Sequence, residues 1–142
     1  MRIKRRATAS WAGTVADGGG RIGVGSGAFE GPFSLKARVE DAAATNPEEL
    51  IGAAHAGCFT MSVANLLGEH GTPAERLSTE ATVHLEQQDG GFSITRIELA
   101  LTGSAAVDAE TFARLARQAK DTCPVSRALA GTEIELTATL DD

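Results

Sequence analysis

The sequence is poor in cysteine, since Cys58 and Cys123 are the only two among 142 residues. Two cysteines are too few for a structural zinc site of the cysteine-rich kind, and we expect neither a metal nor a bound cofactor. A secretory signal is also missing, because the residues after the basic N-terminus lack a long apolar core, so the cytoplasm is the expected compartment. Structural disulfides are rare there, which favours free thiols, a redox pair or a nucleophile.

Positive charge is scarce as well. The chain has 13 Lys and Arg against 19 Asp and Glu, for a formal net charge of -6. A general nucleic-acid binder needs a basic stripe to meet phosphates, and the one basic cluster, at residues 2–6, is typical of a solvated strand or terminus. We therefore expect no nucleic-acid partner.

One long segment lacks charge altogether. Residues 50–68 contain no Asp, Glu, Lys or Arg, and that length could span a bilayer. The segment nevertheless holds His55 and Asn65, its flanks are acidic, and no aromatic or basic belt borders it. These features favour a buried helix in a soluble protein over a membrane span.

The order of periodic segments predicts a single α+β domain over residues 1–142, with a mostly antiparallel sheet. Period-two alternation predicts strands, and a 3.6-residue period predicts helices. Glycine-rich turns are expected at residues 17–21, 30–32 and 89–91. The predicted strands are 3–11, 21–29, 33–39, 78–87, 92–102 and 132–140, and the predicted helices are 46–69, 108–120 and 124–130.

The strongest start signal belongs to the long central helix. Asn46 can cap it, Pro47 suits its first position, and two glutamates follow. Its residues are apolar or small on nearly every side, which is typical of a helix buried all round. One short chain cannot cover such a helix, so we expect a homodimer whose interface contains it; a monomer with an Ala-rich packed helix is the alternative.

The two cysteines occupy different settings. Cys58 lies in the middle of the central helix among small residues, where a buried thiol can be a mere packing residue. Cys123 precedes Pro124 and is expected to cap the short helix 124–130, where the exposed amides would favour a thiolate. From the residues alone, Cys123 is the more acidic thiol, and both a reactive pair and buried structural thiols stay open.

A peroxide-reducing cysteine needs a thiolate, a cation beside it and a way out of the sulfenic acid. Arginine suits the cation because its charge persists and its planar fork holds two atoms. Arg38 and Arg21 are the candidates, and Glu48 or Glu49 can hold a buried arginine. Ten positions separate Glu48 from Cys58, about 15 Å along an unbroken helix, so a shared site requires a broken helix or a glutamate from a second subunit. We favour the second subunit.

His55 lies one turn before Cys58 on the same helix face. It could serve as the base of a Cys–His hydrolase, although no third residue at a recognisable spacing would orient it. The alternative is that His55 packs in the dimer interface with Ser62 and Asn65.

Two segments carry a resemblance to a known family. Residues 45–58 (TNPEELIGAAHAGC) resemble the signature segment of the OsmC/Ohr family, closest to its osmotically inducible OsmC branch, and residues 123–126 (CPVS) resemble its second cysteine motif. The resemblance covers almost the whole chain. It implies an OsmC-like intertwined dimer, in which sheets wrap around central helices, and a peroxidase for organic hydroperoxides that reduces hydrogen peroxide less well.

By motif position, the resemblance assigns Cys58 as the peroxidatic cysteine, Cys123 as the resolving one, and Glu48 as the active-site glutamate. Arg38 matches the arginine of the OsmC branch, while Arg21 lies where the Ohr branch has its own. The implied reductant is a dithiol such as a lipoyl protein, and expression under stress is implied too. For the attacking thiol we follow the family, because a desolvated ion pair can outweigh a dipole effect of roughly 1 kcal/mol. A redox sensor that uses the same thiol pair is the other function considered.

Overall fold

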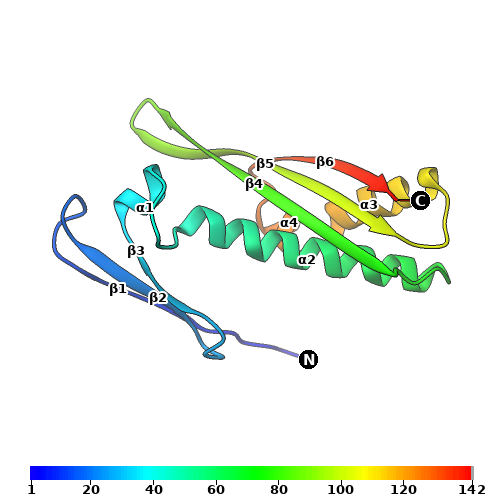
Figure 1. The fold of residues 1–142 in the computed structure, drawn as a ribbon, viewed down its shortest axis with the longest axis horizontal. Coiled ribbons are helices and arrows are strands. Elements are labelled where there is room, and N and C mark those ends of the chain that lie inside the picture. The colour runs from blue at the N-terminus through cyan, green and yellow to red at the C-terminus, as the bar shows by residue number, and fades with distance from the viewer. Residues whose placement is uncertain (142) are drawn as a thin grey trace. The chain divides into compact units, whose positions relative to one another are not determined.

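The computed structural model describes residues 1–141. These residues form two compact units that divide between Leu50 and Ile51. Apart from residues 33–39, strands and helices follow each other along the chain in the order that the sequence predicts for an α+β protein, which confirms the fold class. Figure 1 traces this order from the N-terminal strands to the C-terminal strand. That residues 1–142 act as one domain stays a prediction.

The first unit contains a small antiparallel sheet in the order β1-β2-β3, formed by Ala7–Ala12, Gly19–Val24 and Glu30–Phe33. Trp11 and Phe33 meet edge to face with ring centroids 5.2 Å apart. Gly20 lies between them, and a Cβ there would collide with the Ser10 carbonyl oxygen and would approach the Phe33 ring to 2.5 Å. This position therefore requires glycine for close packing.

The predicted strand at 33–39 is wrong. Leu35–Val39 forms a short helix, α1, which Ser34 caps by accepting a hydrogen bond from the Ala37 amide at 3.1 Å. The apolar alternation of this segment is real, but a serine cap followed by good helix formers outweighs it. The turn predicted at 30–32 is wrong for the same segment, because the chain reverses earlier, near Gly27 with φ +78°.

Helix α2 spans Pro47–Glu69, as the sequence predicts. Asn46 accepts a hydrogen bond from the Glu49 amide at 2.8 Å, and Gly71, with φ +85°, follows the last turn. Within residues 1–141 it is the one helix whose length and composition would allow it to cross a membrane, and 28% of its most apolar window is buried within the chain. One stripe is fully covered, at His55, Phe59, Val63 and Leu67.

The second unit contains a sheet in the order β4-β5-β6. Strands β4 (Arg76–Gln88) and β5 (Gly91–Ser104) form the predicted hairpin, which turns at Gly90 with φ +91°. Strand β6 (Glu133–Leu140) pairs in parallel with β5, so the chain holds two three-stranded sheets with one parallel pair. A parallel pair needs a crossover, which α3 (Ala109–Thr122) and α4 (Pro124–Ala128) provide.

The core of the second unit lies between this sheet and its helices. Figure 1 shows α2 running along the β4-β5-β6 sheet. Apolar side chains of α2, β5 and α3 fill the space between them: Phe59, Val63, Leu67, Ile97, Leu99, Leu101, Phe112 and Leu115. Cys123 belongs to the same cluster and is 1% exposed. The core thus holds the end of α3, and the cysteine after it, against α2.

Candidate active site

Cys58 lies on α2 beside an open groove. The groove has a volume of about 440 Å³, and its walls come from α2 and from the junction of α3 with α4, at Met61, Ser62, Asn65, Leu66, Thr122 and Pro124. The Cys58 side chain is half-buried, and its sulfur is a free thiol. A small molecule in this groove would therefore lie next to Cys58.

Cys123 lies between α3 and α4, in the extended conformation that a following proline favours. Its sulfur accepts a hydrogen bond from the Ser126 amide at 3.3 Å, so Cys123 caps α4 as the sequence predicts. Its thiol also donates to the Ser126 hydroxyl at 3.1 Å. The buried thiol thus has hydrogen-bond partners on one short segment.

The two thiols contact each other, although 65 positions separate them in the sequence. Burial raises the pKa of the Cys58 thiol above its ordinary value. A hydrogen bond from the Val125 amide acts in the opposite direction, and the neighbouring Cys123 thiol raises the pKa further. Cys58 in this state is protonated at neutral pH, so its use as a nucleophile requires a further positive charge near the sulfur.

The predicted arginine and glutamate pair with each other in the first unit. Arg38 places Nε 2.9 Å and Nη2 2.7 Å from the same Glu48 oxygen, Oε1. The Glu48 side chain is 9% exposed, whereas that of Arg38 is 40% exposed. Among residues 1–141, the buried Glu48 Oε2 has no hydrogen-bond partner. Glu48 therefore holds Arg38 by one oxygen and keeps the other unpaired.

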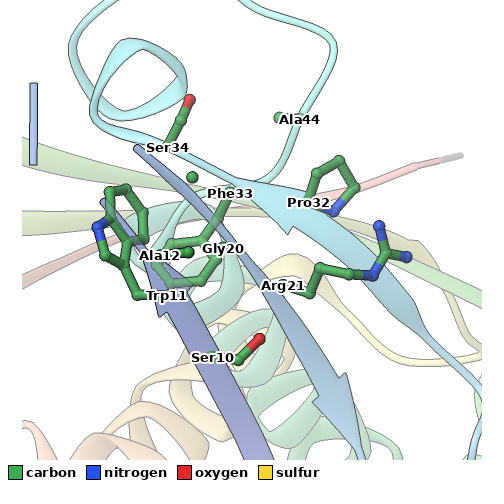
Figure 2. A pocket seen from close by; sticks show the side chains of 10 residues that line it. Ser10, Trp11, Ala12, Gly20, Arg21, Pro32, Phe33, Ser34 and Ala44 are labelled. Atoms are coloured by element: carbon green, nitrogen blue, oxygen red, sulfur yellow. The ribbon is translucent and has the colours of Figure 1, made fainter. Parts of the chain in front are cut away.

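Arg21 pairs instead with Glu30, Nε to Oε1 at 2.8 Å, and both side chains are more than half exposed. It lies beside a groove of about 520 Å³ on the first sheet, with Trp11 and Phe33 at one end and Arg21 next to Pro32 at the other (Figure 2).

Arg38 lines a different, smaller hollow of about 220 Å³ with Trp11, Phe33, Leu35 and Pro47. Glu49, the other candidate partner, accepts from Thr45 at 2.7 Å.

His55 meets a residue to which the sequence assigned no role. Its Nε2 lies 2.7 Å from the Ser126 hydroxyl oxygen, and the ring is fully buried. The expected neighbours Ser62 and Asn65 line the groove beside Cys58 instead. Burial lowers the pKa of His55 below 6.5, its ordinary value. No sequence signal points to this pair, because 71 positions separate the two residues.

No orienting group completes a hydrolase arrangement around His55, since its Nδ1 has no hydrogen-bond partner among residues 1–141. Over the same residues, no three His, Cys, Asp or Glu side chains gather in a way that would hold a metal ion.

Comparisons with known proteins show the family to which the chain belongs. A family model described as OsmC-like protein matches residues 40–138. Peroxiredoxin OsmC of Escherichia coli strain K12 is 41% identical over 134 residues, which cover 91% of this chain and 92% of that protein. The chain belongs to the OsmC family.

Solved structures agree. The organic hydroperoxide resistance protein OhrB of Bacillus subtilis has a TM-score of 0.71 and 26% identity, with 98% of each chain covered. An OsmC-like protein of Mycoplasma pneumoniae reaches a TM-score of 0.79 at 17% identity over the whole of both chains, which supports the fold alone. The relatives that carry functional names are thus of the peroxidase type.

Proposed function

We propose that this protein is a thiol-dependent peroxidase that reduces organic hydroperoxides, and hydrogen peroxide less well, through Cys58 and Cys123. One observation carries the proposal: Cys58 borders an open groove while its thiol contacts a second, buried thiol. A cysteine peroxidase needs this combination, because peroxide must reach the first sulfur and the second must be close enough to condense with it. The peroxidase-type relatives support the same class.

The catalytic cycle has three steps. The Cys58 thiol first loses its proton, and the thiolate attacks the outer oxygen of the hydroperoxide. The O–O bond breaks, Cys58 becomes a sulfenic acid, and the alkoxide takes up the proton that the thiol released and leaves as the alcohol. Cys123 then attacks the Cys58 sulfur, a disulfide forms, and water leaves. A dithiol, such as a protein-bound lipoyl group, returns the disulfide to two thiols.

Arg38, held by Glu48, supplies the positive charge that the Cys58 thiolate needs. The raised pKa of Cys58 makes such a charge necessary, and Arg38 is the better anchored of the two candidate arginines. Helix α2 is continuous from Pro47 to Glu69, so the predicted alternative of a broken helix is not observed. About 15 Å along that helix separate Glu48 from Cys58, so the pair comes from a second copy of the chain.

The second copy covers α2. Small and apolar residues follow each other along an exposed side of this helix at three- to four-residue spacing, at Ala53, Gly57, Met61, Ala64 and Gly68. Met61 is 74% exposed, which is costly for an apolar side chain in water. This exposed side supports a homodimer through α2 rather than a membrane span. We also propose the cytoplasm as the compartment and no nucleic-acid partner.

A single-turnover experiment tests the peroxidase. Reduced protein receives one equivalent of cumene hydroperoxide, and its cysteines are mapped by mass spectrometry with a sulfenic-acid trap. Wild type should form a Cys58–Cys123 disulfide, and Cys123→Ser should accumulate a sulfenic acid on Cys58. Cys58→Ser serves as the matched control and should leave the peroxide unconsumed.

Sulfenic acid on Cys123 in the Cys58→Ser variant would make Cys123 the peroxidatic cysteine and Cys58 the resolving one. The protein would still be a peroxidase. Peroxide that persists in wild type, with both thiols reduced, would overturn the proposal and favour buried structural thiols.

The raised pKa of Cys58 favours one other candidate, a redox sensor that oxidises without fast turnover. Sustained peroxide consumption with excess dithiothreitol supports the peroxidase. A single slow oxidation per chain, with no turnover, supports the sensor.

A further inference from the structure

His55 is a buried titratable group that the reaction above does not use. It is 0% exposed and forms the first position of the covered stripe on α2. A buried imidazole without function costs stability through its desolvated nitrogens, one of which has no partner among residues 1–141. Its other nitrogen makes a short hydrogen bond to a residue that contacts a reacting sulfur.

The hydrogen bonds from Cys123 to His55 form a chain with one direction. Cys123 Sγ donates to Ser126 Oγ at 3.1 Å, so the serine hydroxyl keeps its own proton for the next partner. That partner is His55 Nε2, at 2.7 Å. Residue Ser126 is only 4% exposed, so bulk water does not compete for these hydrogen bonds. A relay in this direction uses the tautomer in which Nε2 accepts from the Ser126 hydroxyl and Nδ1 carries the ring proton.

The imidazole is neutral in this setting, because burial lowers the pKa of His55. A neutral imidazole whose free nitrogen faces a hydroxyl is the arrangement that activates a nucleophile through a general base. Here the hydroxyl is an intermediate carrier, and the group beyond it is a thiol.

We infer that Ser126 and His55 form a proton relay that activates Cys123 for its attack on the Cys58 sulfenic acid. The inference rests on the proposed function and concerns its second step only. Ser126 is the catalytic residue of the relay, because its hydroxyl touches the reacting Cys123 sulfur. His55 acts through Ser126 as a positioning residue and proton acceptor.

Disulfide formation moves two protons along the relay and breaks one S–O bond. The Cys123 S–H bond breaks and its proton moves to Ser126 Oγ, while the serine proton moves to His55 Nε2. The Cys123 sulfur bonds to the Cys58 sulfur, and the S–O bond of the sulfenic acid breaks. The departing hydroxide receives the proton back from His55 through Ser126 and leaves as water. Two sulfurs are joined, and no outside oxidant or base is consumed.

The Ser126 amide supports the same step from the other side. It donates to Cys123 Sγ at 3.3 Å, so it stabilises negative charge on the sulfur once the proton has left. One serine therefore receives the thiol proton with its side chain and stabilises the thiolate with its backbone.

Four variants test the relay by rapid quench and mass spectrometry after one equivalent of cumene hydroperoxide. The readout is the rate of disulfide formation divided by the rate of Cys58 oxidation in the same protein. Ser126→Thr and Ser126→Val form a matched pair, because both add the same bulk and only threonine keeps the hydroxyl. Ser126→Ala removes the hydroxyl without added bulk. His55→Gln keeps an acceptor for Ser126 but has no basic nitrogen.

We expect the ratio to fall about 100-fold or more in Ser126→Val, Ser126→Ala and His55→Gln, since general-base effects begin at about that scale. Ser126→Thr should stay within about threefold of wild type, because its hydroxyl restores the relay. A role in filling space alone would not separate threonine from valine, since the two side chains have nearly the same volume. If valine at position 126 misfolds, alanine and His55→Gln decide the outcome.

Two results overturn the inference and differ from each other. In the first, Cys58 is oxidised normally and Ser126→Val, Ser126→Ala and His55→Gln all keep the wild-type ratio of the two rates. This result would rule out the relay and leave the proposed peroxidase standing. In the second, Cys58 of the wild-type protein is not oxidised by the hydroperoxide. This result would rule out the proposed function and therefore the relay as well.

Discussion

Arg38 and Arg21 have the same charge and each pairs with a glutamate, but their anchoring differs. The partner of Arg38 is almost fully buried, whereas both members of the Arg21–Glu30 pair are more than half exposed. An exposed pair gains little, because water screens it and its long side chains stay free to move. A buried carboxylate bound by two guanidinium nitrogens fixes the position of Arg38.

We therefore expect Arg38→Lys to slow Cys58 oxidation by about tenfold or more, because lysine keeps the charge but lacks the planar fork. Arg21→Lys is the matched control and should change the rate by less than about twofold. Single-turnover consumption of cumene hydroperoxide measures both. The reverse ranking would assign the thiolate support to Arg21.

Some residue roles follow from local sequence and others do not. Asn46 and Cys123 cap their helices as predicted, because a cap depends only on the residues that follow it. The contact between His55 and Ser126 depends instead on how α2 and α4 pack, which no local pattern encodes. Local sequence therefore places His55 only among neighbours on its own helix.

At the scale of elements, the first sheet depends on a close approach at Gly20. A Cβ at this position would meet the Ser10 carbonyl oxygen and the rings of Phe33 and Trp11, whereas nothing lies within 4 Å of a Cβ at Gly19, its neighbour in β2. The two glycines thus differ only in the space around them.

We expect Gly20→Ala to destabilise the β1-β2-β3 sheet by roughly 1–3 kcal/mol, because backbone and rings must move to make room. Gly19→Ala should be neutral or slightly stabilising, since alanine reduces the freedom of the unfolded chain. Hydrogen exchange of the amides in 7–33 measures both variants. Equal protection in the two would contradict the packing argument.

Element boundaries were predicted well where end signals are strong. Helix α2 has a cap, a proline and a terminal glycine, and the β4-β5 hairpin turns at a glycine pair. Segment 33–39 has mixed signals, and there the helix cap prevailed over alternation.

At the scale of the whole molecule, the question is what covers α2. The helix is apolar or small on nearly every side, yet a single chain fully buries only one stripe of it. An apolar surface that stays in water costs about 25 cal/mol per Å², so a second copy of the same helix gains from covering it.

We expect the protein to sediment as a dimer and Met61→Glu to shift it toward monomer, because a carboxylate in that interface would be desolvated without a partner. Gln118→Glu, an exposed position on α3, is the control and should leave the dimer intact. Analytical ultracentrifugation over a range of concentrations measures both. A monomeric wild type, or a Met61→Glu protein that stays dimeric, would contradict an interface at this part of α2.

By itself the sequence determined the fold class, the order of nearly all elements and the family, because caps, turns and apolar periods act within a few residues of each other. Only the tertiary structure decided which distant side chains meet. In the tertiary structure Cys58 contacts Cys123, and Arg38, not Arg21, pairs with Glu48. His55 meets Ser126, and β6 pairs in parallel with β5. These contacts depend on the packing of whole elements around a shared core, where one shift of a helix or strand would change every partner.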